Sequence, residues 1–538
     1  MAAVAGRLWA DVDSPENSNF SEHVTRRTPA QARLDMMLIS GGDERIWLDP
    51  VTRRNRYGAP ASPASEELWF SSAAASAISP RGYAAATRAF YAHARMGADP
   101  AALFNDIRIR IAALVGLPGM EVALAASAAE AEFTALAVAR ALFDRQIVNI
   151  LIAPDEVSDG ARAAASGRHF GDTAAFAPHV ERGAPLAGWA EEEAALRTVA
   201  IRDDEGLALP AFEIDRAAAR HVADALAQHC APILHLLDSS KTGRAGLSRE
   251  AARGIVASCG DRALVVVDAS QLRCTFEDIR ADLEAGFLVI ISGSKFAGGP
   301  AFCGALLIPP CKAAQLRDMK LPAGLGAYTA RLDWPESFAH AFGAGSFAPA
   351  NLGLALRWVA ALSEMEAFAG TPAAIRDSVV ARFAETVRRA VASNMNLDFL
   401  DAESWRLGQP ATIYPVVALG ADPAQTQRLH DWLASPLGAQ GASDLDRICH
   451  LGQPTVAGER AALTISLSMP QINGVAERLS QNMDFDAAFM PLRRDIELLF
   501  RKLDVLVSRT RTGAPPMSRP ARSSLAPAHA LRQRLGVP

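Results

Sequence analysis

Short apolar runs alternate with amphipathic stretches through the middle of this chain, and this alternation constrains the fold most. The runs are rich in Val, Ile and Leu, as buried strands are, and they occupy residues 147–153, 197–202, 233–237, 263–268, 287–292 and 303–308. Helical stretches such as 211–229 and 248–258 separate most of them. Strands alternating with helices predict an α/β fold, with a mostly parallel sheet between two layers of helices. Only a loop separates the last two runs, so an antiparallel strand is an open alternative there.

The pattern changes after Asn351. Two amphipathic helical stretches come first, followed by strand candidates at 412–419 and 461–468 and a final helix near 485–507. This order predicts a smaller α+β domain that is joined to the large one by a long helix.

The domain organisation follows from these changes in pattern. A chain of 538 residues is too long for a single core, so two cores are expected. We expect an N-terminal arm and large domain over 31–350, and a long helix with the small C-terminal domain over 351–508. The polar segment 1–30 and the arginine- and proline-rich segment 509–538 are predicted to be disordered, because neither can bury a core.

Composition excludes several classes of protein. A net charge of −5 and a pI near 6.2 leave no basic surface for nucleic acid. The six cysteines form no CxxC pair and have no histidines at zinc spacing, so neither a disulfide framework nor a metal site is expected. The first twenty residues lack the apolar segment of a secretory signal, and no apolar run approaches the ~20 residues that span a bilayer. We therefore expect a cytoplasmic protein that does not bind membranes.

Two polar residues stand at the ends of consecutive strand candidates. Asp268 ends the run Val265-Val266-Val267, and Lys295 follows the next run within a loop of small residues. The carboxyl ends of parallel strands are where open α/β sheets bind ligands. Pyridoxal phosphate (PLP) requires a lysine that binds it covalently and an acid that keeps its ring nitrogen protonated. The alternatives are a helix-capping role for Asp268 and an exposed loop position for Lys295.

A third feature lies earlier in the chain. Ser127 and Glu130 stand at capping-box spacing, which predicts a helix that begins at Ser127 and ends near Phe143. The free amides at such a helix start can bind a phosphate. A well-capped helix with no ligand is the alternative.

Together these features, in this order, resemble the class V aminotransferase and cysteine-desulfurase family of fold-type I PLP-dependent enzymes, over roughly residues 69–503. The resemblance implies an aspartate-aminotransferase-like fold, with a large PLP-binding domain and a smaller α+β C-terminal domain. It also implies PLP as cofactor, a small amine or amino-acid-like substrate, and a homodimer.

The matching motifs imply roles for single residues. Asp268 would contact the pyridine nitrogen, Gln271 the phenolic oxygen, and Lys295 would be the Schiff-base lysine. The turn Ser127-Ala128-Ala129 resembles the family's phosphate-binding turn, and Ser292 with Ser294 precedes the lysine where the family has Ser-x-His. Further matches place substrate contacts at Ser239 and Thr242, and a phosphate contact from the second subunit at Gly345 and Ser346.

The sequence also departs from the family pattern. Ser294 replaces the usual histidine, and no aromatic residue stands at 154–158 to stack on the cofactor ring, although His169 is an alternative. Thr464 occupies a position where an arginine often binds the substrate carboxylate, so its role in substrate binding is an open prediction. Cys449 lies two residues from the place of the desulfurase nucleophile, so a buried packing role is the favoured interpretation.

Aminotransfer is the reaction that these observations favour. Carbon–sulfur or other β-elimination is the first alternative, and decarboxylation is the second. A non-catalytic relative that keeps the fold is a rival, against which Asp268 and Lys295 argue. An unrelated nucleotide-binding enzyme is disfavoured, because the sequence has neither a Walker A motif nor a GxGxxG that links a strand to a helix.

Overall fold

The computed structural model describes residues 28–97, 99–157, 160–189, 194–316, 318–343, 347–402, 410–437 and 444–512. Gly345 and Ser346, predicted to contact the cofactor of a second subunit, lie outside these residues. So do the segments predicted to be disordered, except for residues 28–30 and 509–512. Residues 28–30 lead into α2 (Pro29–Leu38) and residues 509–512 end α16 (Phe485–Thr512).

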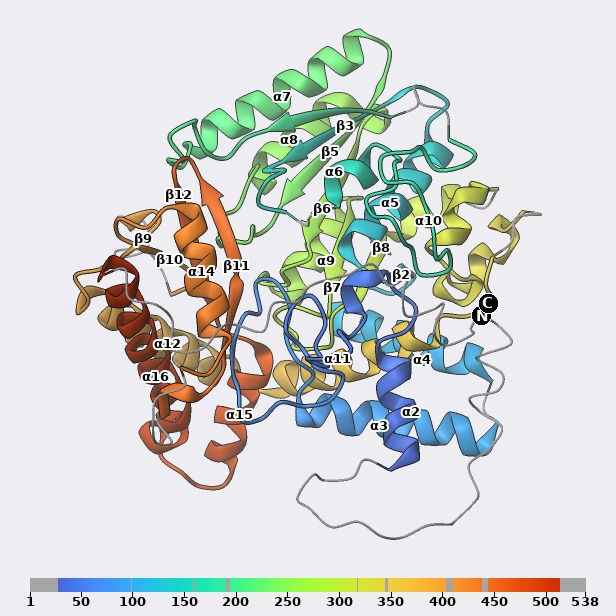
Figure 1. Ribbon diagram of the computed structural model, residues 1–538. Helices are drawn as coiled ribbons and strands as arrows, with labels where there is room; N and C mark the ends of the chain where they lie inside the picture. The colour runs from blue at the N-terminus through green and yellow to red at the C-terminus, as the bar shows by residue number, and fades with distance from the viewer. Residues whose placement is uncertain are drawn as a thin grey trace.

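The larger sheet has seven strands in the order β2-β8-β7-β6-β5-β3-β4 (Figure 1). Only β8 runs antiparallel to its neighbours, β2 and β7. The prediction of a mostly parallel sheet is therefore confirmed, and the antiparallel alternative holds for the last run. The strands are β2 (Glu121–Ala125), β3 (Ile147–Ile152), β4 (Ala194–Val199), β5 (Ala231–Leu237), β6 (Leu264–Ala269), β7 (Leu288–Ser292) and β8 (Gly304–Ile308).

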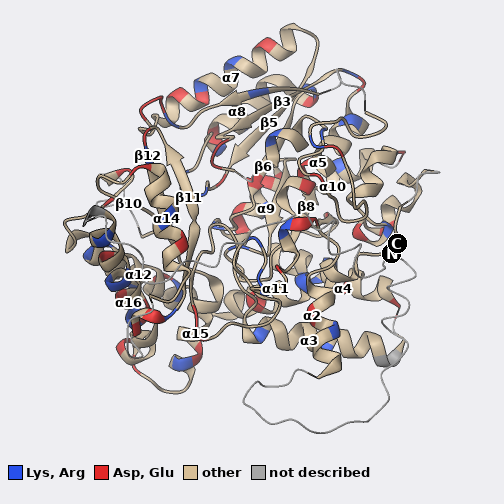
Figure 2. Cartoon of the chain, viewed as in Figure 1, with Lys and Arg blue, Asp and Glu red and all other residues tan. Residues whose placement is uncertain are grey.

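Helices cover both faces of this sheet. Val265 and Val267 of β6 pack into one apolar cluster, whereas Leu264 and Val266 pack into another, because side chains alternate along a strand. Burial on both faces explains why these strands are continuous apolar runs, and Figure 2 shows them almost free of charged residues. α5 (Ala128–Leu142) covers one face. The other face is covered by α4 (Pro100–Val115), α7 (Ala211–Ala227), α8 (Arg249–Cys259), α9 (Phe276–Glu284) and α11 (Leu352–Gly370).

The second sheet has five strands in the order β1-β11-β12-β10-β9, and all of them except β1 belong to the orange part of Figure 1. Its first strand comes from the N-terminal arm, a pairing that the sequence pattern did not reveal: Leu68 pairs in parallel with Cys449. The strands are β1 (Leu68–Phe70), β9 (Leu397–Phe399), β10 (Ile413–Ala418), β11 (Cys449–Ala457) and β12 (Arg460–Ser466). The helices of this part are α12 (Ala373–Ala392), α14 (Pro423–Leu433), α15 (Met469–Ser480) and α16.

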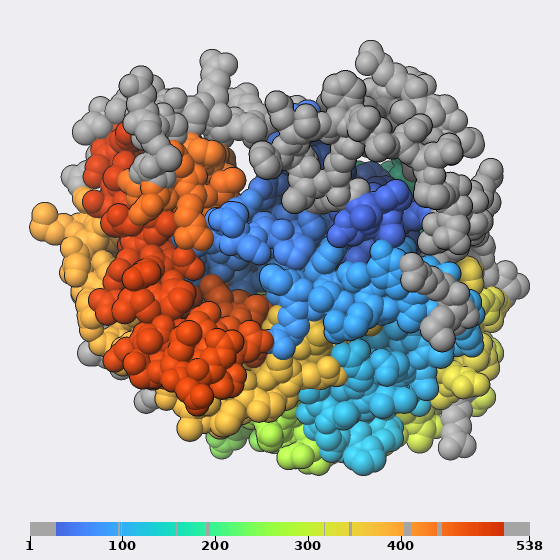
Figure 3. Space-filling model, turned by 90° about the horizontal axis from the view of Figure 1, so that it is seen from below, coloured from blue at the N-terminus to red at the C-terminus, as the bar shows by residue number. Residues whose placement is uncertain are grey.

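The N-terminal helix α3 (Pro80–Met96) and the C-terminal helix α15 meet on one side of the molecule. Figure 3 shows the blue N-terminal surface against the orange and red C-terminal one, and Arg81 of α3 forms an ion pair with Glu477 of α15. No helix in the described ranges is long and apolar enough to span a bilayer. The remaining short elements are η1 (Glu44–Ile46), α6 (Ala161–Ala165), η2 (Gly260–Arg262), α10 (Pro310–Ala313), η3 (Ala314–Leu316), η4 (Ala323–Ala327), η5 (Arg331–Asp333), η6 (Glu336–Ala341) and η7 (Asp444–Asp446).

Candidate active site

Asp268 and Lys295 lie close together at the carboxyl edge of the large sheet. Asp268 is near the end of β6, and Lys295 follows β7, the neighbouring strand. The Lys295 Nζ donates a hydrogen bond to the Ser270 Oγ over 3.1 Å, and the Ser270 amide donates to the Asp268 Oδ1 over 3.0 Å. Ser270 therefore links the amine to the strand end that carries the carboxylate.

Two glycines hold the lysine loop against α11. The Gly293 amide donates to the Cys303 carbonyl over 2.7 Å, and the Gly299 amide donates to the Gly293 carbonyl over 2.9 Å. A Cβ atom at Gly293 or Gly299 would lie 2.6 or 2.7 Å from the Cβ of Ala361 in α11. Only glycine fits at this distance, so the loop is fixed on a rigid helix and its lysine is fixed with it.

The start of α5 forms an anion cradle, by which we mean the amides of Ala128 and Ala129 together with the hydroxyls of Ser292 and Ser294. Ser127 caps the helix as its spacing predicts: its Oγ accepts from the Glu130 amide over 3.3 Å, and its own amide donates to the Glu130 Oε2 over 3.2 Å. The first backbone donor inside the helix is Ala131, which leaves the two earlier amides for a ligand.

The cradle and the lysine line a single pocket. The Ser292 and Ser294 hydroxyls lie 2.8 Å apart in it. Six predicted residues line this pocket: Ser127, Ala128, Ala129, Ser292, Ser294 and Lys295. Four further polar residues line it that the sequence did not identify, namely Arg45, Tyr57, Lys241 and Gln453. Arg45 and Tyr57 come from the irregular N-terminal arm, where no periodic pattern could have indicated them.

Gln271 and His169 differ in their relation to this pocket. The Gln271 Nε2 donates to the carbonyl of Ala73, a lining residue, over 2.7 Å. The Gln271 Oε1 is buried and has no hydrogen-bond partner among the described residues. Buried polar atoms normally have a partner, so this oxygen is available to a ligand. His169, the alternative stacking residue, does not line the pocket, and its Nδ1 lies 2.7 Å from the Tyr328 hydroxyl.

A buried polar row lies behind Asp268, on the face of the sheet that α5 covers. The His235 Nε2 lies 3.1 Å from the Asn149 Oδ1, and the His235 Nδ1 lies 3.6 Å from the Glu132 Oε2. The Asn149 Nδ2 donates to the Ala165 carbonyl, so its Oδ1 is an acceptor and the His235 Nε2 must be the donor. The imidazole Nδ1 then presents a lone pair towards Glu132.

Burial fixes the protonation of this row. It lowers the pKa of His235 to about 4, and it raises the pKa of Glu132 well above its usual value, with a further contribution from the charge of Asp268. Burial therefore disfavours a second negative charge on Glu132 beside Asp268. The sequence did not reveal this row, because Glu132, His235 and Asn149 lie on three separate elements.

The loop 239–243 is held by a buried carboxylate. The Ser240 hydroxyl donates to the Glu156 Oε2 over 2.6 Å, the Thr242 hydroxyl also donates to it, and the Lys241 amide donates to the Glu156 carbonyl over 3.0 Å. Glu156 in turn pairs with Arg202, which also pairs with Asp401 of the second domain. Lys241 lines the pocket, whereas the predicted substrate residues Ser239 and Thr242 are buried beside it and do not.

Thr464 and Cys449 lie within the second sheet rather than in the pocket. Thr464 is 1% exposed, and its Oγ1 has no hydrogen-bond partner in the described part of the chain. Cys449 is fully buried, and its Sγ donates weakly to the Arg447 carbonyl over 3.6 Å. Burial raises the pKa of Cys449 to about 11, so the thiol is not ionised at neutral pH.

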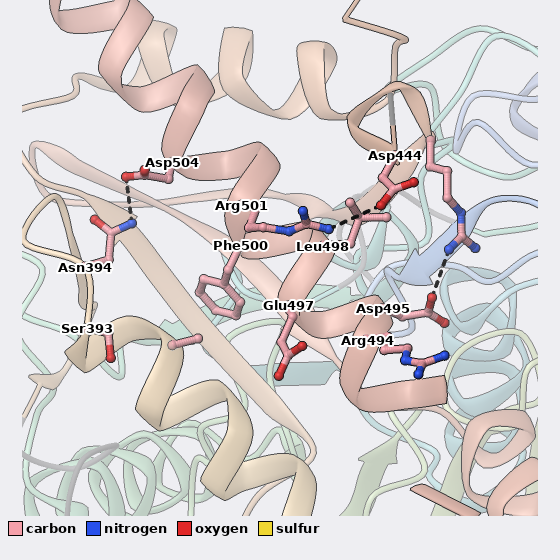
Figure 4. Close-up of a pocket in the computed structure, with 12 residues that line it drawn as sticks. Ser393, Asn394, Asp444, Arg494, Asp495, Glu497, Leu498, Phe500, Arg501 and Asp504 are labelled. Carbon is pink, nitrogen blue, oxygen red and sulfur yellow. Dashed lines mark hydrogen bonds and ion pairs between the residues drawn. The ribbon is translucent and has the colours of Figure 1, made fainter. Parts of the chain in front are cut away.

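A larger hollow of about 700 Å³ lies in the second domain between α12, α16 and η7 (Figure 4). Four of its charged side chains form two ion pairs. Arg501 lies 3.7 Å from Asp444, and Arg447 lies 3.0 Å from Asp495. Mutually paired, exposed charges of both signs indicate a solvated surface and not a binding site.

The residues of the Lys295 pocket fit PLP. The pocket offers an amine for covalent attachment, and amides and hydroxyls for a phosphate. Gln271, which donates to the lining residue Ala73, adds a buried acceptor without a partner among the described residues. The carboxylate of Asp268 stands beside the lysine through Ser270. These are the groups that the cofactor requires.

Comparisons with known proteins extend this description. No protein-family model matches the sequence, and no curated protein is similar to it. Among solved structures, the cysteine desulfurase CsdA from Escherichia coli is 13% identical with a TM-score of 0.50, over 83% of this chain and 96% of that one. Ureidoglycine-glyoxylate aminotransferase from Bacillus subtilis is 12% identical with a TM-score of 0.48, over 85% and 96% of the two chains. The likeness to CsdA confirms the predicted aspartate-aminotransferase-like fold.

Proposed function

We propose that this protein is a PLP-dependent enzyme that acts on an amine or amino-acid-like substrate through Lys295, with aminotransfer as the reaction. The observation that carries the proposal is the position of the Lys295 amine. It lies in one pocket with the anion cradle of α5 and next to the strand end that bears Asp268. The fold, which resembles that of a cysteine desulfurase, supports PLP as the cofactor.

Each residue has a distinct task in this proposal. Bound PLP supplies an electron sink for negative charge that develops at the substrate carbon. Lys295 attaches the cofactor and, once released from it, moves the proton at the carbon that bears the substrate nitrogen. Asp268 would hold a proton on the ring nitrogen, and burial of Glu132 behind it disfavours a second negative charge there. The amides of Ala128 and Ala129, with Ser292 and Ser294, bind the phosphate.

A homodimer is part of the proposal. Gly345 and Ser346 resemble a family motif that completes the phosphate site of the second subunit. Sedimentation should therefore give twice the mass of one chain, and Ser346→Asp should weaken PLP binding in the assembled protein. A fully active monomer would exclude this arrangement.

Visible spectroscopy and labelling test the cofactor. The purified protein supplied with PLP should absorb near the wavelength of lysine-bound cofactor, and borohydride should fix a pyridoxyl label on Lys295. Amino donors should bleach the colour and convert the cofactor to its amine form, which identifies aminotransfer. Lys241→Ala is the matched control, because it removes another lysine of the same pocket and should keep the label. A label on any other lysine would refute the assignment.

The desulfurase alternative depends on a reactive thiol, and the structure offers it little support. Among the described residues, no cysteine lines the pocket, and Cys449 is buried with a raised pKa. We expect Cys449→Ala to retain nearly all activity, and wild type to release little sulfide from free cysteine. Persulfide on Cys449 after incubation with cysteine, absent from the variant, would overturn this expectation and favour carbon–sulfur cleavage.

A further inference from the structure

Arg45 lines the pocket, and the proposed function gives it no role. It lies in η1 of the N-terminal arm and lines the same pocket as the anion cradle and Lys295. Its side chain is only 11% exposed. A buried arginine on the wall of a pocket requires a reason, because desolvation of the charge is costly.

The orientation of Arg45 is fixed on one edge. Its Nε donates to the Asp43 Oδ1 over 2.9 Å, and its Nη2 donates to the Asp43 Oδ2 over 2.7 Å. Asp43 is itself buried, and its Oδ1 accepts the Arg45 backbone amide over 3.0 Å. The guanidinium is planar with five N–H donors, so this pairing leaves the Nη1 edge unused. In the described chain, the Nη1 has no hydrogen-bond acceptor.

Two aromatic rings fix the plane of the guanidinium. Its central carbon lies 4.9 Å from the centroid of the Phe302 ring and 5.2 Å from that of Phe170. Phe302 has a φ of 71°, an unfavourable conformation for a bulky residue, and a Cβ atom at Gly42 would lie 2.9 Å from its ring. Gly42 thus gives the ring the space to lie beside the turn that carries Arg45.

The guanidinium of Arg45 stays charged, and Asp43 is the carboxylate that pairs with it among the described residues. Burial acts to lower the pKa of Arg45, but the hydrogen-bonded Asp43 outweighs burial and the pKa lies above the usual value. Burial raises the pKa of the nearby Glu130 to about 8, so that carboxyl is mostly protonated at pH 7. Glu130 belongs to the first turn of α5, which places Arg45 at the cradle end of the pocket.

We propose that Arg45 binds an oxyanion with its free Nη1 edge. The phosphate of the cofactor and a carboxylate of the substrate share this chemistry, and a fixed guanidinium edge suits both. Arg45 supplies the cationic group that is missing at Ser294 and at Thr464. The inference rests on the proposed function for the identity of the ligands, but anion binding by Arg45 can be tested independently.

Arg54 provides a matched control in the same arm. It forms an ion pair with Glu67, and its Nη1 also donates to the Gly58 carbonyl over 2.7 Å. It does not line the pocket. Arg54→Gln therefore removes a partly buried, paired arginine without touching the proposed anion site.

Binding of PLP and of pyridoxal, which lacks the phosphate, tests whether Arg45 binds the cofactor phosphate. The Kd of each is measured by fluorescence of the apoprotein. If Arg45 binds the phosphate, Arg45→Gln should raise the Kd for PLP roughly 10- to 100-fold, as the loss of a charge-assisted hydrogen bond does, and leave that for pyridoxal nearly unchanged. Arg45→Lys should give an intermediate value, and Arg54→Gln should leave the ratio of the two constants at its wild-type value.

Alanine and ethylamine, which differ by the carboxylate, test in the PLP-loaded protein whether Arg45 binds the substrate carboxylate. If Arg45 binds the carboxylate, Arg45→Gln should abolish the spectroscopically measured preference for alanine while the PLP-to-pyridoxal ratio stays constant. Equal weakening of PLP and pyridoxal, with the alanine preference intact, would show a merely structural role and overturn the inference. An unchanged variant in both arms would overturn it as well.

Inorganic phosphate separates failure of this inference from failure of the proposed function. It should raise the melting temperature of the wild-type apoprotein and of Arg54→Gln, and raise that of Arg45→Gln less. If wild type binds neither PLP nor pyridoxal, the proposed function fails, while a phosphate effect that depends on Arg45 still supports the anion site. If phosphate stabilises Arg45→Gln as much as wild type, Arg45 does not bind phosphate, and only the alanine preference can then support the inference.

Discussion

The pocket at Lys295 and the hollow between α12 and α16 differ in the pairing of their polar groups. The hollow has a volume of about 700 Å³ and the pocket about 70 Å³. In the hollow, Arg501 faces Asp444 and Arg447 faces Asp495, and water reaches these side chains. In the pocket, one edge of Arg45 has no acceptor opposite it among the described residues, and the buried Oε1 of Gln271, whose Nε2 donates to the lining residue Ala73, has no donor. Unpaired polar atoms mark the site better than its size does.

The physical reason is the cost of an unpaired buried group. Leaving a buried donor or acceptor without a partner costs roughly 1–3 kcal/mol. An exposed ion pair contributes about 0–1 kcal/mol, so its presence indicates little about function. Substitutions in the Lys295 pocket and in the hollow between α12 and α16 should therefore have very different effects.

Lys295→Ala should have the largest effect. It removes both the covalent attachment of the cofactor and the proton-transfer group, so turnover should fall by at least about 10³-fold, since proton transfer alone contributes 10²–10⁴-fold. Its melting temperature should stay close to that of wild type, because the side chain is only partly buried. Turnover and unfolding are measured on the same preparation. Retained turnover with a lowered melting temperature would mean that Lys295 has a structural role. The pocket would then differ from the hollow in no functional respect.

Asp268→Asn should have the second largest effect. The amide cannot hold the ring nitrogen protonated, so turnover should fall by roughly 10²-fold or more while PLP remains bound. Spectrophotometric titration gives PLP binding, and steady-state assays give turnover. Wild-type turnover in the variant would mean that Asp268 only accepts a hydrogen bond from the Ser270 amide and has no role in catalysis.

Glu130→Gln should change the pH dependence of stability. Burial raises the pKa of Glu130 to about 8, so its contribution to stability is present below the unfolded pKa of about 4.5 and is lost as the pH rises to about 8. Glutamine keeps the capping box and does not ionise. The stability of the variant relative to wild type should therefore increase by about 1.4 kcal/mol per pH unit between pH 5 and pH 8.

Urea titrations of both proteins at several pH values measure this difference. Glu250→Gln, at an exposed position in the first turn of α8, is the matched control. Its stability difference from wild type should stay constant over the same range. A constant difference for Glu130→Gln as well would mean that the carboxyl at the start of α5 is ionised when folded.

Substitutions in the larger hollow should have the smallest effect. Arg501→Gln and Asp444→Asn break an ion pair whose side chains are 61% and 80% exposed, so each should change stability by less than about 0.5 kcal/mol. Turnover and PLP affinity should remain at wild-type values. A tenfold loss of either would show that the larger hollow takes part in function, and that unpaired polar atoms do not distinguish the two sites.

The sequence predicted six of the seven strands of the large sheet, because most of them are apolar runs between turn residues, but β2 was not among the predicted runs. The predicted run at 197–202 also begins three residues later than β4. The sequence placed Lys295 and Asp268 as well, since both stand at strand ends where chain direction alone brings them to one edge. The pocket positions of Ser127 and Ser292 followed from a local capping pattern and from the resemblance.

The remaining features depend on contacts between distant segments. Arg45 lies in an arm without periodicity, and only folding brings it beside Phe302 and Glu130. The row of Glu132, His235 and Asn149 combines one residue from each of three elements. The pattern could not show that Thr464 lies inside the second sheet, because a buried and a pocket-lining position on one strand have the same spacing.

The pairing of β1 with β11 has a consequence for the order of folding during synthesis. Close to this pairing, the Arg447 Nε donates to the Glu66 carbonyl, 381 residues earlier in the chain. A ribosome adds about 5–20 residues per second, so β1 waits roughly 20–80 s for its partner strand to be made. Until then the apolar side chains of Leu68 and Phe70 have no sheet to pack against, so the nascent arm should be a binding segment for chaperones. The arm that carries Arg45 should then be the last part of the pocket to become ordered.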